Sequence, residues 1–266
     1  MVTRVNSFIT VLADSCHGVG FALSKALMAK KSTWLAAATP SNDCLTQFKN
    51  AFWDGDRIVS QRVNLADEAE INGFLAKAEF SLDSACGIGS VIANVGSTPS
   101  RWQQFEHKPF PKVHETSAAE WLRFGKDVAG VGILLKTTIP RMISSPPLDG
   151  RKVIAILGHV SSPRHCRNAC AFLAADAALD AMVDSLSCEL TATSALAAEF
   201  VTVKIDAPML GTEKQIDLWC AVLVEQLSKL RHDDNFAQEH NGRTLEIPNF
   251  PSAKSIDTAW YGSEVS

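Results

Sequence analysis

Short apolar runs alternate with helix-length segments along almost the whole chain. Runs suited to strands cover residues 7–13, 33–38, 57–65, 88–94, 152–157, 200–205 and 243–247. Helices are expected after several of them, including 118–127, 131–143, 168–193 and 213–230. Strands separated by helices of ten or more residues favour parallel pairing, because such a crossover needs a helix-length connection. We therefore predict an α/β protein with a doubly wound parallel sheet of about seven strands and helices on both faces.

Length and composition narrow the possible functions. The 266 residues suit a single domain over 1–266, in which 248–266 forms a C-terminal tail. A net charge of −4 gives no electrostatic reason to expect nucleic acid or an anionic membrane as a partner. The seven cysteines are scattered without metal-ligand spacing, which indicates reduced thiols and no metal site. With no secretory or membrane-spanning pattern, we expect a soluble cytoplasmic protein.

Small and polar residues follow several of the predicted strands. The first strand ends in a turn that carries Asp14, Gly18 and Gly20, and a helix follows it. Glycines in such a turn let backbone N–H groups approach a pyrophosphate at the helix N-terminus. Further polar or small residues close the third, fourth and sixth strands, namely Asn64, Asn94, Gly96 and Pro208.

In order and spacing, these segments resemble the short-chain dehydrogenases/reductases over nearly the whole chain. The turn at 14–20 is similar to the family's Gly-x-x-x-Gly-x-Gly, and 93–96 is similar to its Asn-Asn-Ala-Gly. The segment 206–212 is similar to the Pro-Gly-x-x-x-Thr that follows the sixth strand. The resemblance implies a Rossmann-like sheet and a homodimer or homotetramer.

The residues at the catalytic positions of the family have changed. The resemblance places Phe172 and Asp176 where the family has its Tyr-x-x-x-Lys pair. A phenyl ring has no proton to donate, and a carboxylate reverses the charge that lowers the phenol's pKa. The catalytic Ser position falls on Gly158 or His159, and the Asn position is Asp127. Losing one general acid typically costs roughly 10²–10⁴-fold, so standard carbonyl reduction is not expected.

Nucleotide binding is left open by the sequence. Gly18 and Gly20 preserve much of the phosphate turn, whereas Asp14 adds a negative charge to it. Asn64 offers an amide oxygen to adenine, and 94–96 keeps the small bend beside the ribose. The second strand ends without an acid, and the hydroxyls of Thr39 and Ser41 tolerate a 2′-phosphate, so NADP(H) is favoured over NAD if either binds. The alternative is a packing relic that binds no nucleotide.

The altered pocket suggests chemistry without hydride transfer. Asp127, His159 and Asp176 are expected to face one cleft at the carboxyl edge of the sheet. Two carboxylates beside Phe172 are expected to raise at least one pKa, which suits an acid, a base or a partner for a cationic substrate. Aromatic residues are candidates for a hydrophobic binding surface: Trp102, Phe105, Phe110 and Trp121. The alternatives are a solvated charge at Asp176, an ordinary loop histidine at His159 and an aromatic cluster that belongs to a core or dimer contact.

Three functional hypotheses follow. The first is a non-redox cyclase or isomerase that acts on a small hydrophobic, alkaloid-like or polycyclic substrate, with Asp176 as acid/base or cation partner. It is similar in fold and degeneracy to reductase-like, Diels–Alderase-type proteins of fungal secondary metabolism. The second is a catalytically inactive protein that binds NADP or a partner. The third is an atypical NADPH-dependent reductase that uses His159 or water as its proton donor.

Overall fold

A computed structural model describes residues 7–15, 18–52, 57–82, 86–94, 117–158, 170–192, 194–206 and 212–247. The strands are β1 (Phe8–Ala13), β2 (Thr33–Thr39), β3 (Ile58–Arg62), β4 (Ile88–Asn94), β5 (Lys152–Gly158), β6 (Phe200–Asp206) and β7 (Arg243–Leu245). The helices are α1 (Gly18–Met28), α2 (Asn42–Ala51), α3 (Glu68–Ser81), α5 (Ala118–Ser144), α6 (Cys170–Thr191), α7 (Ser194–Ala197), α8 (Glu213–His232) and α9 (Asp234–His240).

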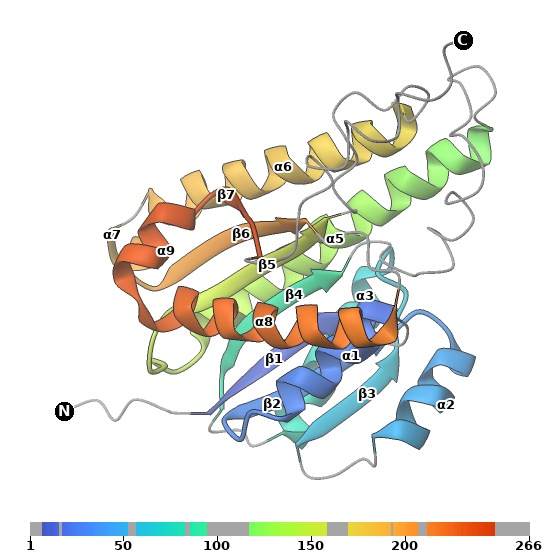
Figure 1. Cartoon of the computed structure of the whole chain (residues 1–266), viewed down its shortest axis with the longest axis horizontal. Coiled ribbons are helices and arrows are strands. Elements are labelled where there is room, and N and C mark those ends of the chain that lie inside the picture. The colour runs from blue at the N-terminus through green and yellow to red at the C-terminus, as the bar shows by residue number, and fades with distance from the viewer. Residues whose placement is uncertain are drawn as a thin grey trace.

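All seven strands lie in one parallel sheet, in the order β3-β2-β1-β4-β5-β6-β7 (Figure 1). The strand order reverses between β1 and β4. In sheets of this kind the crevice outside the carboxyl ends of the strands binds ligands at that reversal. The predicted doubly wound sheet is confirmed, and β1, β4, β5 and β6 all end at its carboxyl edge.

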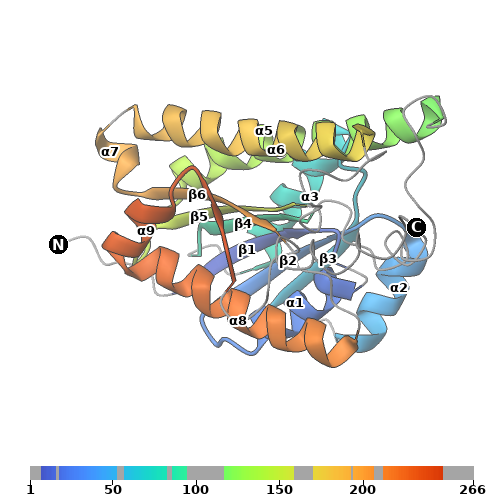
Figure 2. The ribbon, with the colours of Figure 1, turned by 45° about the horizontal axis from the view of Figure 1, so that its top comes forward.

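Helices cover both faces of the sheet, as predicted. Figure 2 shows α5 and α6 side by side over one face, with α3 next to them, and α1 and α8 over the other. Each strand therefore sends alternate side chains into two separate cores. In β6, Val201, Val203 and Ile205 pack in the core with α1 and α8. Strand alternation then turns Thr202 and Lys204 toward α6.

The helix α5 corrects one prediction, because the expected helices 118–127 and 131–143 form a single helix, Ala118–Ser144. The residue at the expected break, Gly130, is buried in it. A Cβ atom there would lie 3.0 Å from the Cβ atom of Leu65. Gly130 thus allows α5 to approach the segment after β3, and its small size reflects packing between elements rather than a helix end.

Three helices, α2, α7 and α9, were not expected from the sequence, and two of them, α2 and α9, begin at capping side chains. Ser41 caps α2, where its side chain accepts from the backbone N–H of Cys44 at 3.2 Å. Asp233 ends α8 and also caps α9, accepting from the backbone N–H of Phe236 at 3.0 Å. These capping side chains define helix starts in segments where apolar periodicity is weak. No described helix has the length and apolar character needed to cross a bilayer.

Candidate active site at the carboxyl edge of the sheet

The turn after β1 keeps the tight geometry expected from its glycines. Asp14 and Gly18 have φ angles of 51° and 48°, in the left-handed region. At Gly20 a Cβ atom would lie 1.9 Å from the backbone oxygen of Asp14, so no other residue fits there without rearrangement. The side chain of Asn94 donates to that same oxygen at 3.0 Å and ties the turn to the end of β4. The turn thus brings the N-terminus of α1 to the carboxyl edge.

The polar residues expected to bind a nucleotide make contacts within the protein itself. Thr39 is buried, and its hydroxyl lies 3.4 Å and 3.3 Å from the backbone oxygens of Ser41 and Gln61. The Ser41 side chain caps α2. The amide oxygen of Asn64 accepts from the backbone N–H of Ala66 at 3.1 Å. Each of these residues therefore has a local structural role beside any role in ligand binding.

A buried lysine that the sequence analysis did not select lies at the centre of the site. The Lys204 side chain on β6 is 2% exposed, and its Nζ atom forms three ion pairs. The partner oxygens are Oδ1 of Asp176 at 2.9 Å, Oδ1 of Asp180 at 2.9 Å and Oδ1 of Asp206 at 3.1 Å. One ammonium group with three N–H donors thus meets three carboxylates. We call these four residues the Lys204 cluster.

Local geometry explains how these four residues meet. Asp176 and Asp180 are four residues apart on α6, so they share one helix face. Lys204 and Asp206 are two residues apart on β6, so their side chains leave the same face of the sheet. Burying an ammonium group costs several kcal/mol unless opposite charges compensate, and three carboxylates provide that compensation.

Gly158, the last residue of β5, makes room for the Lys204 cluster. A Cβ atom at Gly158 would lie 2.5 Å from Cε of Lys204, 3.0 Å from Oδ1 of Asp206 and 3.3 Å from Oδ1 of Asp176. Gly158 is one of the two residues to which the resemblance assigned the catalytic Ser position. The cluster therefore fills the space that a side chain at this position would need.

The charges of the cluster set its proton affinities. Burial raises the pKa of the Asp176 carboxyl, and the attraction of the Lys204 ammonium group does not offset this effect, because Asp206 and Asp180 add negative charge. Burial disfavours the ammonium form of Lys204, but Asp206 and Asp176 outweigh that cost and raise its pKa above the ordinary value. Lys204 is therefore a fixed cation rather than a nucleophile, whereas Asp176 is a carboxyl group suited to proton transfer.

The structure describes only some of the predicted catalytic residues. Asp176 lies at the carboxyl edge with a side chain that is 22% exposed, and its ion pair distinguishes it from a merely solvated surface charge. Asp127 lies on α5 and takes no part in the ion pairs described for Lys204. The carboxylates that shift the pKa of Asp176 are thus Asp206 and Asp180, where the sequence analysis had expected Asp127.

Other predicted residues lie outside the described parts of the chain. These are His159, Gly96 and Pro208, together with Trp102, Phe105, Phe110 and the tail 248–266. Phe172 belongs to the first turn of α6, but its side chain is outside the described set as well. Trp121 lies near the start of α5 and is 40% exposed.

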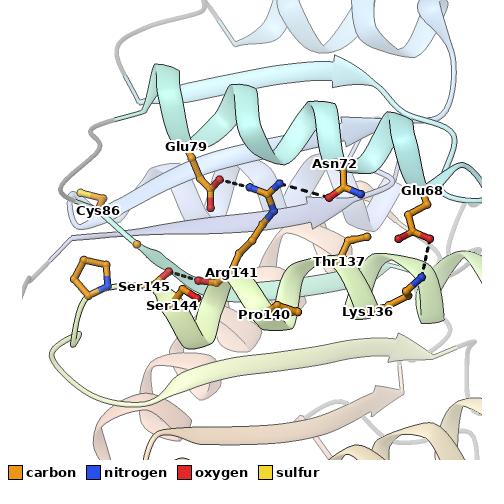
Figure 3. Close-up of a pocket in the computed structure, with 12 residues that line it drawn as sticks. Glu68, Asn72, Glu79, Cys86, Lys136, Thr137, Pro140, Arg141, Ser144 and Ser145 are labelled. Carbon is orange, nitrogen blue, oxygen red and sulfur yellow. Dashed lines mark hydrogen bonds and ion pairs between the residues drawn. The ribbon is translucent and has the colours of Figure 1, made fainter.

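A groove of about 650 Å³ lies between α3 and α5, and none of the predicted site residues lines it (Figure 3). Two charged contacts cross it. Lys136 pairs with Glu68 at 2.8 Å, and Arg141 pairs with Glu79. These pairs are partly exposed, so each contributes little to stability beyond joining the two helices. The Lys204 cluster is therefore the stronger candidate for chemistry.

Comparisons with known proteins place the fold. No family model and no curated protein matches the sequence. Among solved structures, a 3-ketoacyl-(acyl-carrier-protein) reductase from Brucella melitensis complexed with NADH has a TM-score of 0.68 and 15% identity, over 92% of this chain and 98% of that one. An alcohol dehydrogenase from Thermococcus sibiricus complexed with 5-hydroxy-NADP has a TM-score of 0.66 and 16% identity, over 91% and 96%.

A third similar structure is a short-chain oxidoreductase from Pseudomonas aeruginosa PAO1 that contains an atypical catalytic center. It has a TM-score of 0.65 and 14% identity, over 92% of this chain and 97% of that one. The chain has the fold of the short-chain dehydrogenases/reductases. At these identities the likeness concerns the fold, so the chemistry has to be argued from the residues of this chain.

Proposed function

We propose that the protein is an enzyme of the short-chain dehydrogenase/reductase fold that transfers protons at Asp176. The reaction class is a non-redox isomerisation or cyclisation of a small hydrophobic molecule. One observation carries the proposal: a partly exposed carboxyl group with a raised pKa lies beside Gly158 at the carboxyl edge. Ligands bind at this edge in doubly wound folds.

The proposed chemistry follows from the ion pairs. Oδ1 of Asp176 is held against Nζ of Lys204 at 2.9 Å, which limits rotation of the carboxyl group. A positioned carboxyl group whose pKa is raised toward neutrality gives a proton to one substrate atom or removes one from another. Lys204 keeps its own proton and acts as a fixed positive charge. The absence of a tyrosine at position 172 separates this scheme from the carbonyl reduction typical of the family.

Proton exchange with solvent tests the proposal directly. The full chain is incubated in D2O with a panel of polycyclic ketones, and deuterium incorporation next to the carbonyl group is measured by mass spectrometry. We expect Asp176→Asn to slow exchange by roughly 10²–10⁴-fold. Asp184→Asn is the matched control, because Asp184 is an exposed aspartate on the same helix. Exchange by Asp176→Asn at the wild-type rate, or none in the wild type across the panel, would contradict the proposal.

A second candidate is an NADP(H)-dependent reductase, favoured by the turn at Asp14 and Gly20. The close packing of Gly20 and the Asn94 bond suit a backbone cradle for the pyrophosphate at the start of α1. The bound cofactor would supply a hydride. Asp176, rather than a tyrosine, would supply the proton in this chain. Adding NADPH to the same panel separates the candidates: consumption of NADPH that depends on the ketone favours the reductase, and exchange without NADPH favours the isomerase or cyclase.

A further inference from the structure

Lys204 is an unusual residue for its place in the fold. It belongs to the interior of β6, between strands β5 and β7, and its side chain is 2% exposed. Its strand neighbours Val203 and Ile205 are completely buried in the opposite core. An apolar residue of similar volume would avoid the desolvation cost of the charge, and buried ion pairs replaced in that way are often neutral or stabilising. Stability alone therefore gives a weak reason for a lysine here.

We infer that Lys204 is the positioning residue of the candidate active site, where it fixes the carboxyl group of Asp176 and sets that group's affinity for a proton. This inference rests on the proposed role of Asp176 in proton transfer. Lys204 acts through Asp176 and is therefore not itself a catalytic residue.

The geometry gives each carboxylate of the cluster a different exposure to solvent. The side chains of Asp180, Asp206 and Asp176 are 47%, 26% and 22% exposed, respectively. All three share the same buried ammonium group, so the positive charge available to Asp176 is divided among three acids. Removing Asp180 or Asp206 would leave more of that charge for Asp176, whereas removing Lys204 would take its positive charge away from three neighbouring carboxylates.

Gly158 connects the cluster to the ligand-binding edge. A Cβ atom at Gly158 would overlap Cε of Lys204 and would lie in tight contact with Oδ1 of Asp176. Strand β5 pairs with β6 through Gly158 and Asp206, so these two strand ends lie directly beside each other. Lys204 therefore holds its carboxylates where the strands end, rather than deep within the sheet.

Titration of Asp176 in the full chain tests the inference without a substrate. The side-chain carboxyl carbon is followed by ¹³C NMR in the wild type, Lys204→Met, Lys204→Arg and the control Asp184→Asn. Lys204→Met removes the charge, and we expect the proton affinity of Asp176 to rise at least about tenfold, one pKa unit. Lys204→Arg keeps the charge and should reverse part of that rise, and Asp184→Asn should change nothing. Unchanged titration of Asp176 in Lys204→Met would overturn the inference.

A second variant keeps the inference testable if Lys204→Met does not fold. Asp180→Asn changes a half-exposed side chain and removes one competitor for the ammonium group. We expect the proton affinity of Asp176 to fall by about half a pKa unit, roughly threefold. No change, or a rise, would overturn the inference. Because this titration does not depend on turnover, its outcome is separate from that of the deuterium-exchange test.

Discussion

Two buried cations, Lys204 at the carboxyl edge of the sheet and Arg231 at the amino edge, are held in opposite ways. At the carboxyl edge, Lys204 meets three carboxylates. At the amino edge, the Arg231 side chain is stacked on the ring of Phe8, with Cζ 3.6 Å from the ring centroid. Its Nη2 atom donates to the backbone oxygen of Gly89 at 2.8 Å and to the hydroxyl of Ser90 at 2.7 Å. Neutral acceptors and an aromatic ring thus surround the arginine.

The two cations differ in the kind of group that surrounds them. Burial lowers the pKa of Arg231 to about 10, and Asp149 offsets part of this effect. The guanidinium group stays charged at neutral pH, and its partners do not titrate there. The partners of Lys204 are carboxyl groups, and burial raises the pKa of one of them, Asp176. Of these two buried cations, Lys204 is the one held by acidic side chains.

Replacing Lys204 should have the largest effect on stability. Lys204→Met leaves three carboxylates without their cation, and we expect the free energy of unfolding to fall by about 3–5 kcal/mol near neutral pH. The folded variant binds protons more tightly than the unfolded chain, so its stability decreases as pH rises. Urea unfolding of the variant and the wild type at about pH 5 and pH 8 measures the free energy of unfolding of each. The difference between the two proteins should be larger at the higher pH. A deficit independent of pH would contradict the electrostatic account.

Replacing Arg231 should cost somewhat less and show no such pH dependence. Arg231→Met leaves the Gly89 oxygen and the Ser90 hydroxyl without their donor and removes the stack on Phe8, for an expected loss of about 3 kcal/mol. Because the pKa of Arg231 is about 10, its titration lies above the range from pH 5 to pH 8. The same urea measurements should therefore give equal deficits at both pH values. A deficit that grows with pH would remove the distinction between the two edges.

Adding one methyl group at the carboxyl edge should have the smallest effect of the three. Gly158→Ala places a Cβ atom against Lys204 and Asp206, and we expect a loss of about 2 kcal/mol from overpacking. The control is Gly73→Ala on the exposed side of α3, where nothing lies within 4 Å of the added atom. That variant should gain roughly 0.5–1 kcal/mol from helix propensity. Thermal unfolding measures the stability of both variants. A Gly158→Ala variant more stable than the wild type would show that the Lys204 cluster accommodates the added methyl group without loss of stability.

The sheet could be predicted from the sequence because the pattern that indicates it is spread over many strands and helices. Most of the strands are apolar runs, and the alternation with helices leaves few topologies. The helix ends were harder to predict, since they depend on single contacts. The expected gap between the helices 118–127 and 131–143 contains Gly130, whose missing side chain lets α5 approach Leu65. The start of α9 depends on the Asp233 cap rather than on periodicity.

The candidate site was predicted only in part, because it also depends on contacts between individual residues. Asp176 stood out because it occupies a position where the family has a lysine. Lys204 did not, although a signal was present: it is a charged residue inside an apolar strand of a sheet covered on both faces. Alternation places Lys204 and Asp206 on one face of β6, and helical spacing places Asp176 and Asp180 on one face of α6. Their meeting depends on the packing of α6 against β6, which no local pattern specifies.

The close contact at Gly20 gives this position a structural need for glycine that is separate from nucleotide binding. A side chain there would strike the backbone of the preceding turn before any cofactor became relevant. A larger residue at this position would therefore force the turn to rearrange, whether or not the chain binds a nucleotide. The presence of Gly20 alone therefore does not distinguish a turn that binds a nucleotide from one that only packs tightly.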